Sequence, residues 1–392
     1  MPLSNILFFS NSSVRGGVEE HILLLLRGLD RKRFRPVLAC TPTVARLLAN
    51  DLPADVEVVT HEYTGLRNLA GAFRLRAILR QCKIDVLHSH LFWASLFASP
   101  VGWLARVPVI LETPHIRESW RTGWKAKHWI DRIAGRFVDG YIAVSSANRK
   151  YLIETKGLPG RKISVVLNGA DLKRLGAGVS TRSAARARLG LSPGELVLLV
   201  AARLAPQKGH SVLMDAMPAV LQKFPNVRAV FVGDGELRDD LEAKASRMGI
   251  AGAITFAGFQ GNVAEWMTAS DICVLPSFYE GLPLVAIEAQ AVERPVVATH
   301  VDGTPEVVKH GETGLLVPAG DSGALASALI ALLEDAGARE RMGRAGRQWV
   351  ARHFTQEGQI AATEQIYATA LSRRKSGGII NWLAEGAKQV VS

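Results

Sequence analysis

The chain has 392 residues, 48% of them hydrophobic, which is enough for two domains of ordinary size with a core each. Three widely spaced cysteines (Cys40, Cys82 and Cys273) argue against a disulfide framework or a zinc site and favour a reducing compartment. The net charge is +11, and residues 1–175 carry 26 Lys and Arg against 14 Asp and Glu, so the second half is nearly neutral. A basic first half favours an acidic neighbour, either nucleic acid or an anionic membrane face.

The sequence contains no uncharged apolar run of the roughly 18 residues that a membrane helix needs. The nearest candidate, Leu91–Leu111, is interrupted by Pro100, Arg106 and Pro108, and we interpret it as a buried helix followed by a strand. No basic segment precedes the first apolar run, Ile6–Phe9, so we expect no signal peptide and a cytoplasmic protein.

Short apolar runs alternate with amphipathic stretches through the first half, and helical patterns cover Val18–Leu29 and Leu69–Gln81. This alternation predicts a parallel, doubly wound sheet. The expected strands are Asn5–Phe9, Phe34–Ala39, Val56–Thr60, Val86–His88, Val109–Glu112, Gly140–Val144 and Ser164–Leu167.

Two places in the first half suggest a ligand. Gly16 and Gly17 follow the first strand and open a helix, where glycine permits close backbone approach and the helix start favours phosphate, although an ordinary turn fits equally well. His115 follows the strand that ends at Glu112, at the sheet edge where α/β proteins bind ligands; a core histidine is the alternative.

A third feature is aromatic and basic. Five of the eight tryptophans lie between Trp93 and Trp129, and residues 117–136 carry six Lys and Arg against two acidic residues. Tryptophan interleaved with cations is typical of a membrane-surface element. An amphipathic helix that packs its tryptophans inward fits as well, whereas nucleic-acid binding lacks an accompanying motif.

Small and flexible residues in Leu175–Ser183 predict a linker. We expect domains over residues 1–172 and 173–355, facing across a cleft, followed by helices in 356–392 that begin with Gln356–Arg373 and end with Ile379–Val391. The strands expected in the second domain are Leu196–Ala201, Arg228–Val232, Ile254–Ala257, Ile272–Pro276, Val296–Thr299 and Gly314–Val317.

Polar and glycine-containing loops follow the strands of the second domain. Arg203 and Lys208 come after its first strand, and Gly233 ends the next one before a helix. Phe259 and Val263 follow the third strand. Solvated cations and plain turns are the alternatives, but cations at this edge also suit a phosphate-bearing ligand.

Glu280 and Glu288 are eight positions apart, and we expect a helix that starts near Gly281 and carries Glu288 about two turns in. At about 1.5 Å of rise per residue their carboxylates would be roughly 12 Å apart, too far to share one metal. The free N–H groups of the helix start would lie between them and favour an anion. The pattern predicts a ligand with hydroxyls at both ends and charge in the middle, such as a nucleotide sugar.

These motifs, in this order, resemble the retaining glycosyltransferases of family 4, which have the GT-B fold. The resemblance runs from Gly16 to the tail and includes Arg203-Leu-x-x-x-Lys208-Gly, the glutamate pair and Asn168-Gly-Ala-Asp171. The chain has Glu-Gly-Leu-Pro-Leu where Glu-Gly-Phe-Gly is usual, which resembles members that build bacterial surface polysaccharides. It also has Ile116 where the family has an aspartate after the histidine.

The resemblance implies two Rossmann-like domains, the first for the acceptor and the second for the nucleotide-sugar donor. It also implies that the C-terminal helices in 356–392, beginning with Gln356–Arg373, cross back to pack on the first domain. It implies that Arg203 and Lys208 hold the diphosphate, Glu288 the ribose, Glu280 the transferred sugar, and that His115 lies against that sugar. The remaining residues expected to bind the donor are Gly16, Gly17, Gly233, Phe259, Val263, Gly281, Leu282, Pro283 and Leu284.

We therefore expect a metal-independent, retaining glycosyltransferase that uses a UDP- or GDP-sugar and needs no cofactor. Its expected acceptor is a saccharide, lipid-linked and held at the inner face of the plasma membrane, where the chain would be peripheral. A GT-B enzyme without transfer activity, such as a sugar-nucleotide epimerase, is the first alternative. A Rossmann oxidoreductase is disfavoured, because Gly-x-Gly-x-x-Gly does not follow the first strand.

Overall fold

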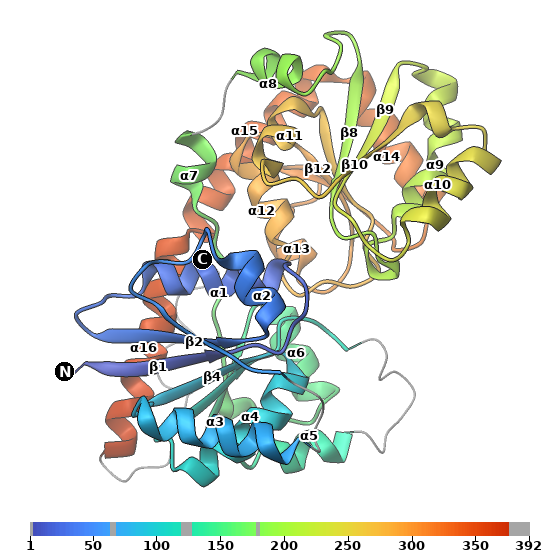
Figure 1. Cartoon of the computed structure of the whole chain (residues 1–392). Helices are drawn as coiled ribbons and strands as arrows, with labels where there is room; N and C mark the ends of the chain where they lie inside the picture. The colour runs from blue at the N-terminus through green and yellow to red at the C-terminus, as the bar shows by residue number, and fades with distance from the viewer. Residues whose placement is uncertain (1–2, 63–67, 119–127, 178–180, 376–392) are drawn as a thin grey trace. The chain divides into compact units, whose positions relative to one another are not determined.

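A computed structural model of the chain describes residues 3–62, 68–118, 128–177 and 181–375 (Figure 1). The chain forms two compact units. Unit 1 comprises Met1–Asn168 together with Gln356–Ser392, and unit 2 comprises Gly169–Thr355.

Unit 1 is built on a parallel sheet with the strand order β3-β2-β1-β4-β5-β6-β7, which confirms the doubly wound sheet predicted from the alternating pattern. The order reverses between β1 and β4, and such a switch point is where ligands of these sheets bind. The strands are β1 Ser4–Phe9, β2 Phe34–Cys40, β3 Glu57–Thr60, β4 Val86–His90, β5 Val109–Thr113, β6 Gly140–Ala143 and β7 Ile163–Val165.

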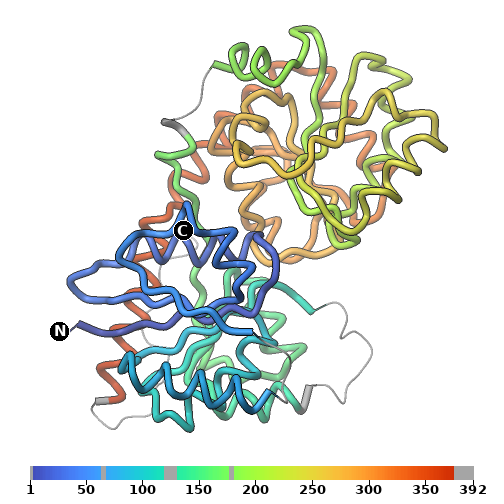
Figure 2. Tube along the Cα trace, viewed as in Figure 1, coloured from blue at the N-terminus to red at the C-terminus, as the bar shows by residue number. Residues whose placement is uncertain are grey.

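The last described helix, α16, belongs to unit 1 although it follows unit 2 in the sequence (Figure 2). It contacts α1 and β5, and its Tyr367 is fully buried in one core cluster with Phe8 and Leu26. The helices of unit 1 are α1 Gly17–Gly28, α2 Pro42–Leu48, α3 Leu69–Gln81, α4 Phe92–Ala105, α5 His128–Ala134, α6 Ser146–Glu154, the 3-10 turn η3 Gly160–Lys162 and α16 Gln356–Lys375.

Unit 2 repeats the architecture, with parallel strands in the order β10-β9-β8-β11-β12-β13. The strands are β8 Leu196–Ala201, β9 Val227–Val232, β10 Ile254–Gly258, β11 Ile272–Leu275, β12 Val296–Thr299 and β13 Gly314–Val317. The helices and 3-10 turns are α7 Leu172–Ala177, α8 Arg182–Arg188, η4 Pro206–Lys208, α9 His210–Lys223, α10 Arg238–Arg247, η5 Ala251–Ala253, α11 Val263–Ala269, α12 Leu284–Ala291, α13 Thr304–Val307, α14 Ser322–Glu334 and α15 Ala336–His353.

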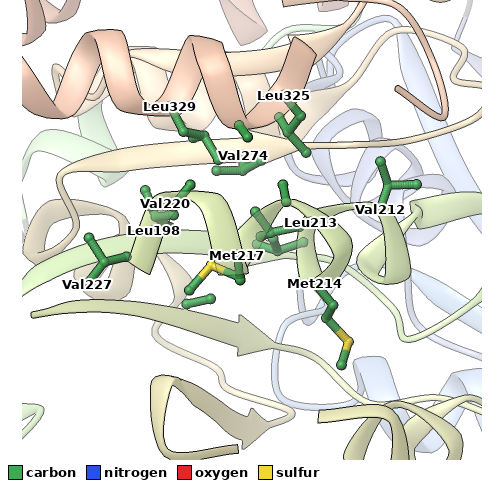
Figure 3. Packing of buried hydrophobic residues seen from close by; sticks show 14 of the residues in the cluster. Leu198, Val212, Leu213, Met214, Met217, Val220, Val227, Val274, Leu325 and Leu329 are labelled. Atoms are coloured by element: carbon green, nitrogen blue, oxygen red, sulfur yellow. The ribbon is translucent and has the colours of Figure 1, made fainter. Parts of the chain in front are cut away.

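A large hydrophobic cluster of unit 2 lies between the sheet and the helix pair α9 and α14 (Figure 3). Leu213 and Met217 of α9, Leu198 of β8 and Leu329 of α14 are all buried there. Each such side chain contributes on the order of 2 kcal/mol by leaving water, which fixes the sheet and hence the loops at its carboxyl edge.

The predicted linker is wrong over its first part, because residues 172–177 form helix α7, which packs on α12. The division between the units falls after Asn168 rather than after residue 172. Immediately beyond it, Ala170 pairs with Thr355, and its N–H donates to Phe354 O at 3.0 Å.

The apolar segment Leu91–Leu111 forms α4 and β5, as predicted. Among the described residues, no helix combines the length and the apolar character needed to cross a bilayer.

Candidate active site

The residues predicted to bind a donor in unit 2 follow four neighbouring strands of one sheet. Arg203 and Lys208 come after β8, Gly233 after β9, Glu280 after β11, and Phe259 after β10. Because the strands are parallel, these loops emerge at the same edge.

The loop after β8 is hydrogen-bonded to the turn after β9. Leu204 N–H donates to Asp234 O at 3.0 Å, and Gly233 N–H donates to Gly258 O at 2.8 Å. Gly233 has a φ of 141°, and a Cβ added there would lie 2.1 Å from Ala202 O. Glycine is therefore required at this position by packing within the chain itself. Arg203 projects from the same loop with an exposed side chain.

Lys208 and Glu280 form the closest contact of the candidate site. Lys208 Nζ donates to Glu280 Oε1 at 2.6 Å, and the Glu280 side chain is 8% exposed against 25% for Lys208. Gln207 supports the same junction, since its side-chain amide donates to Tyr279 O at 2.9 Å. The sequence did not indicate this pair, because 72 positions separate the two residues.

Asp302 holds the backbone of Glu280, because Glu280 N–H donates to Asp302 Oδ2 at 2.9 Å. Asp302 follows β12 and has a φ of 41°, a left-handed conformation that aspartate tolerates better than most residues. Sequence reasoning missed this residue. Its position after a buried strand, directly before a glycine, was the available signal.

The helix that carries Glu288, α12, starts later in the sequence than predicted. It starts at Leu284, directly after Pro283, so Glu280 lies outside it and Glu288 lies only in its second turn. The helix start expected near Gly281 is therefore wrong, whereas the separation of the two carboxylates stays a prediction. The Leu282-Pro283 pair is consistent with the delayed start, because Leu282 is buried at 4% exposure and the residue before a proline is disfavoured in the helical conformation.

The remaining predicted donor residues have different surroundings. Gly281, Leu282 and Pro283 are buried, whereas Leu284 and Glu288 are partly exposed. Phe259 is 66% exposed beside the Gly233–Gly258 hydrogen bond, and Val263 is the first residue of α11. An exposed aromatic ring beside a glycine turn offers a flat surface on which a base can stack.

In unit 1, His115 belongs to a buried group of histidines. His115 Nε2 lies 2.9 Å from His90 Nδ1, and the rings of His115 and His21 are 4.6 Å apart and nearly perpendicular. Burial, followed by the neighbouring imidazoles, holds the pKa of His115 well below the usual value for histidine. His115 is therefore neutral at pH 7. The sequence around His115 did not indicate that these histidines would be its neighbours.

Gly16 and Gly17 belong to the same part of unit 1, because α1 begins at Gly17 and also carries His21. Gly16 N–H donates to Glu19 Oε2 at 3.0 Å. A Cβ added at Gly16 would lie no closer than 3.7 Å to the atoms around it that the structure describes. Packing within those residues does not demand glycine there, in contrast to Gly233.

The aromatic and basic stretch at 117–136 lies partly outside the described residues, which omit 119–127. The segments that flank this gap are joined by the buried Lys156, which donates to Glu118 Oε1 at 2.8 Å and lies 3.5 Å from Asp131 Oδ1. Whether the tryptophans of this stretch contact membrane stays a prediction.

Solved structures with similar folds define the class. The chain superposes on Anabaena HepE in complex with UDP and glucose with a TM-score of 0.82 at 24% identity, covering 93% of this chain and 100% of that one. It superposes on WaaG, a glycosyltransferase involved in lipopolysaccharide biosynthesis, with a TM-score of 0.75 at 14% identity, covering 92% and 99%. The chain therefore has the GT-B fold.

The sequence comparisons define the family. Residues 15–174 match the model of Glycosyltransferase Family 4, and residues 181–349 match that of Glycosyl transferases group 1. The D-inositol 3-phosphate glycosyltransferase of Streptomyces bingchenggensis is 32% identical over 349 residues, covering 83% of this chain and 73% of the relative. An Escherichia coli UDP-Gal:alpha-D-GlcNAc-diphosphoundecaprenol alpha-1,3-galactosyltransferase is 26% identical over 280 residues, covering 69% and 72%. The chain belongs to glycosyltransferase family 4 and is a glycosyltransferase.

Proposed function

We propose that this glycosyltransferase moves a sugar, with retention of configuration, from a UDP-sugar to a lipid-linked saccharide in the synthesis of a bacterial surface polysaccharide or glycolipid. The observation that carries the donor part is the contact between Lys208 and Glu280 at 2.6 Å, beside the exposed Arg203 and the turn at Gly233. This contact places a cation, which suits a diphosphate, directly beside a carboxylate, which suits sugar hydroxyls.

The geometry of this pair suggests how the donor would bind. An ammonium group has three protons, so Lys208 can keep its bond to Glu280 while donating to a phosphate oxygen. Glu280 neutralises part of the Lys208 charge, which leaves Arg203 as the more available cation. We propose that Arg203 and Lys208 together stabilise the departing nucleoside diphosphate without a metal.

UDP is favoured over GDP by the names of similar proteins. HepE structures contain UDP with glucose or UDP-glucose, and the Escherichia coli relative is named for UDP-Gal. We propose that Phe259 and Val263 lie at the base, Glu288 at the ribose, and Gly16, Gly17 and His115 near the transferred sugar.

The lipid-linked acceptor is supported by the relative named for a diphosphoundecaprenol substrate and by the basic first half of the chain. Unit 1 also exposes large apolar side chains on two helices that pack together, namely Phe73 on α3 and Trp93 and Trp103 on α4. Aromatic residues on a basic unit suit the interface of an anionic membrane. We propose peripheral binding to the inner face of the plasma membrane.

The donor is tested by thermal shift with a panel of UDP- and GDP-sugars, because a ligand that binds only the folded protein raises its melting temperature. We expect a UDP-sugar to stabilise the wild type and to stabilise Arg203→Ala much less. Stabilisation by GDP-sugars alone would contradict the choice of UDP.

Transfer is tested by mass spectrometry of products formed from that donor with and without a lipid-linked saccharide acceptor. Proton NMR of the new linkage reports whether configuration is retained, and a parallel reaction in EDTA tests metal independence. A sugar nucleotide altered in the absence of acceptor would instead indicate an epimerase. An inverted linkage would contradict the retaining mechanism.

Membrane binding is tested by flotation with liposomes that contain anionic lipid, and neutral liposomes serve as the control. We expect the protein to float with the anionic vesicles and to dissociate in high salt. Equal recovery in the soluble fraction with and without vesicles would contradict a membrane-bound state.

A further inference from the structure

The backbone of residues 277–280, which follows β11, is anchored to the loops on both sides of it. On one side, Phe278 N–H donates to Gln207 O in η4 at 2.8 Å. On the other side, Thr299 Oγ1 at the end of β12 donates to Ser277 O at 2.5 Å. Because β11 lies between β8 and β12 in the sheet, these anchors come from the loops of both neighbouring strands.

Asp302 supplies the anchor for Glu280 itself. Its Oδ2 atom accepts a hydrogen bond from Glu280 N–H at 2.9 Å, and Lys208 Nζ donates to Glu280 Oε1 at the far end of the same residue. A carboxylate oxygen accepts a stronger hydrogen bond than a neutral oxygen does. Glu280 is therefore held at its backbone from the β12 side and at its carboxylate from the β8 side.

The backbone of Asp302 has an uncommon conformation. Its φ of 41° lies in the left-handed region, which residues other than glycine seldom occupy. Glycine would adopt this conformation with less strain, but it would remove the oxygen that accepts the Glu280 N–H. A strained residue retained beside a candidate active site is a reason to look for a role of its side chain.

We propose that Asp302 is a positioning residue for sugar recognition: it fixes the place of Glu280, and through Glu280 it acts on the transferred sugar but not on the nucleoside diphosphate. This inference rests on the proposed function, which places Glu280 at the sugar and Arg203 and Lys208 at the diphosphate. A binding group has to be held within about 0.5 Å of its productive place. Loss of the anchor should therefore weaken recognition of the sugar and leave the binding of UDP intact.

A merely structural role for Asp302, in shaping the turn before α13, predicts a different pattern. Glycine suits the φ of 41°, so Asp302→Gly would preserve the turn and would behave like the wild type. Damage to the turn by Asp302→Ala would in that case affect UDP and UDP-sugars alike. The comparison of the two variants therefore separates the hydrogen bond from the backbone conformation.

The first test is calorimetric titration of the full chain with UDP, UDP-glucose and UDP-galactose. We expect Asp302→Gly and Asp302→Ala to bind UDP within about twofold of the wild type and to bind the preferred sugar nucleotide at least about tenfold more weakly, because small misplacements of a positioned group are this costly. Asp302→Asn keeps an acceptor oxygen and tolerates the left-handed conformation, so it should restore most of the affinity.

Glu293→Gly is the matched control, because Glu293 also has a left-handed φ, of 60°, and its side chain pairs with Arg347 on the surface. This variant should bind UDP and the sugar nucleotides like the wild type. Similar sugar-nucleotide binding by Asp302→Gly and Glu293→Gly would overturn the proposal, and so would an equal loss of UDP and sugar-nucleotide affinity in Asp302→Gly.

The second test needs no ligand. Amide hydrogen exchange of peptides that cover residues 277–282 should be faster in Asp302→Gly and Asp302→Ala than in the wild type, and close to the wild type in Asp302→Asn. Unchanged exchange in Asp302→Gly would overturn the proposal. If the wild type binds UDP but neither sugar nucleotide, the proposed donor is contradicted instead, and the exchange rates alone decide whether Asp302 positions Glu280.

Discussion

Lys208 Nζ lies 2.6 Å from Glu280 Oε1, so a cation expected at the diphosphate and a carboxylate expected at the sugar hold each other directly. Removing either residue changes more than one ligand contact, because the partner loses its counter-charge. A buried carboxylate without a cation costs more than the pair as a whole contributes. The effects of substitutions at Lys208 and Glu280 should therefore be coupled rather than independent.

We predict that Lys208→Ala and Glu280→Gln each lower kcat/KM at least about tenfold. The double variant should lose much less than the product of the two effects, because one interaction is removed twice. Steady-state kinetics with the identified donor measures this. Lys223→Ala is the matched control, since its pair with Glu334 is on the surface with both side chains more than half exposed. Independent, multiplicative losses would contradict coupling.

We predict that Gly233→Ala abolishes donor binding or greatly weakens it. The added Cβ would lie 2.1 Å from Ala202 O, and the φ of 141° is one that alanine rarely adopts. The loop that carries Arg203 would have to move. Gly252→Ala is the control, because a Cβ there meets nothing within 4 Å. Thermal shift with the donor measures the difference, and equal binding by both variants would refute the assignment.

We predict that Glu112→Gln changes how the stability of unit 1 depends on pH. Burial raises the pKa of the Glu112 carboxyl from 4.5 to about 7, although Lys156 opposes the shift. The folded protein thus binds this proton more tightly than the unfolded chain, so the carboxyl contributes its stability at low pH and loses it as pH rises from 4.5 to about 7.

Glutamine imitates the protonated form and should remove this dependence. The free energy of unfolding of the wild type relative to Glu112→Gln should fall by about 3 kcal/mol between pH 4.5 and pH 7. This free energy is measured by amide hydrogen exchange in the strands of unit 1, because buried strand amides exchange only when the whole unit unfolds. A constant difference across this pH range would show that Glu112 is ionised in the folded state.

We predict that Lys156→Met destabilises unit 1 by about 3–5 kcal/mol, because it removes a buried ammonium group that contacts the buried carboxylates of Glu118 and Asp131. Methionine keeps most of the volume of the lysine side chain, so the loss measures charge rather than packing. Lys150→Met is the control, since Lys150 lies in the preceding helix α6 and is exposed. Similar urea midpoints for the two variants would contradict this account.

The periodicity of the sequence was sufficient to predict the sheet of each unit. The strands Leu196–Ala201, Val296–Thr299 and Gly314–Val317 and the helix Leu69–Gln81 have the bounds expected from their apolar patterns. Such patterns are local, and both faces of a parallel sheet are covered, so its strands appear as short continuous apolar runs.

Contacts between distant residues could not be predicted in this way. The family motif indicated Lys208 and Glu280 separately, but the bond between them depends on two strands lying side by side. Likewise, His115 was identified by its position at a strand end. Its partners His21 and His90 carry no local signal, because an isolated histidine in an apolar segment is usually a core residue. The start of α12 was misplaced because the buried Leu282 belongs to the preceding loop.

The return of α16 to unit 1 has a consequence for how the protein is made. Tyr367 of α16 is hydrogen-bonded to His88, and Gln359 of the same helix is hydrogen-bonded to His21. The interior of unit 1 is therefore completed by residues that leave the ribosome after the whole of unit 2. Unit 2 is one uninterrupted segment and can fold as soon as it emerges, whereas unit 1 begins first and finishes last. Until then the nascent chain exposes the apolar surface that α16 later covers, and it is in this interval that chaperones would be needed.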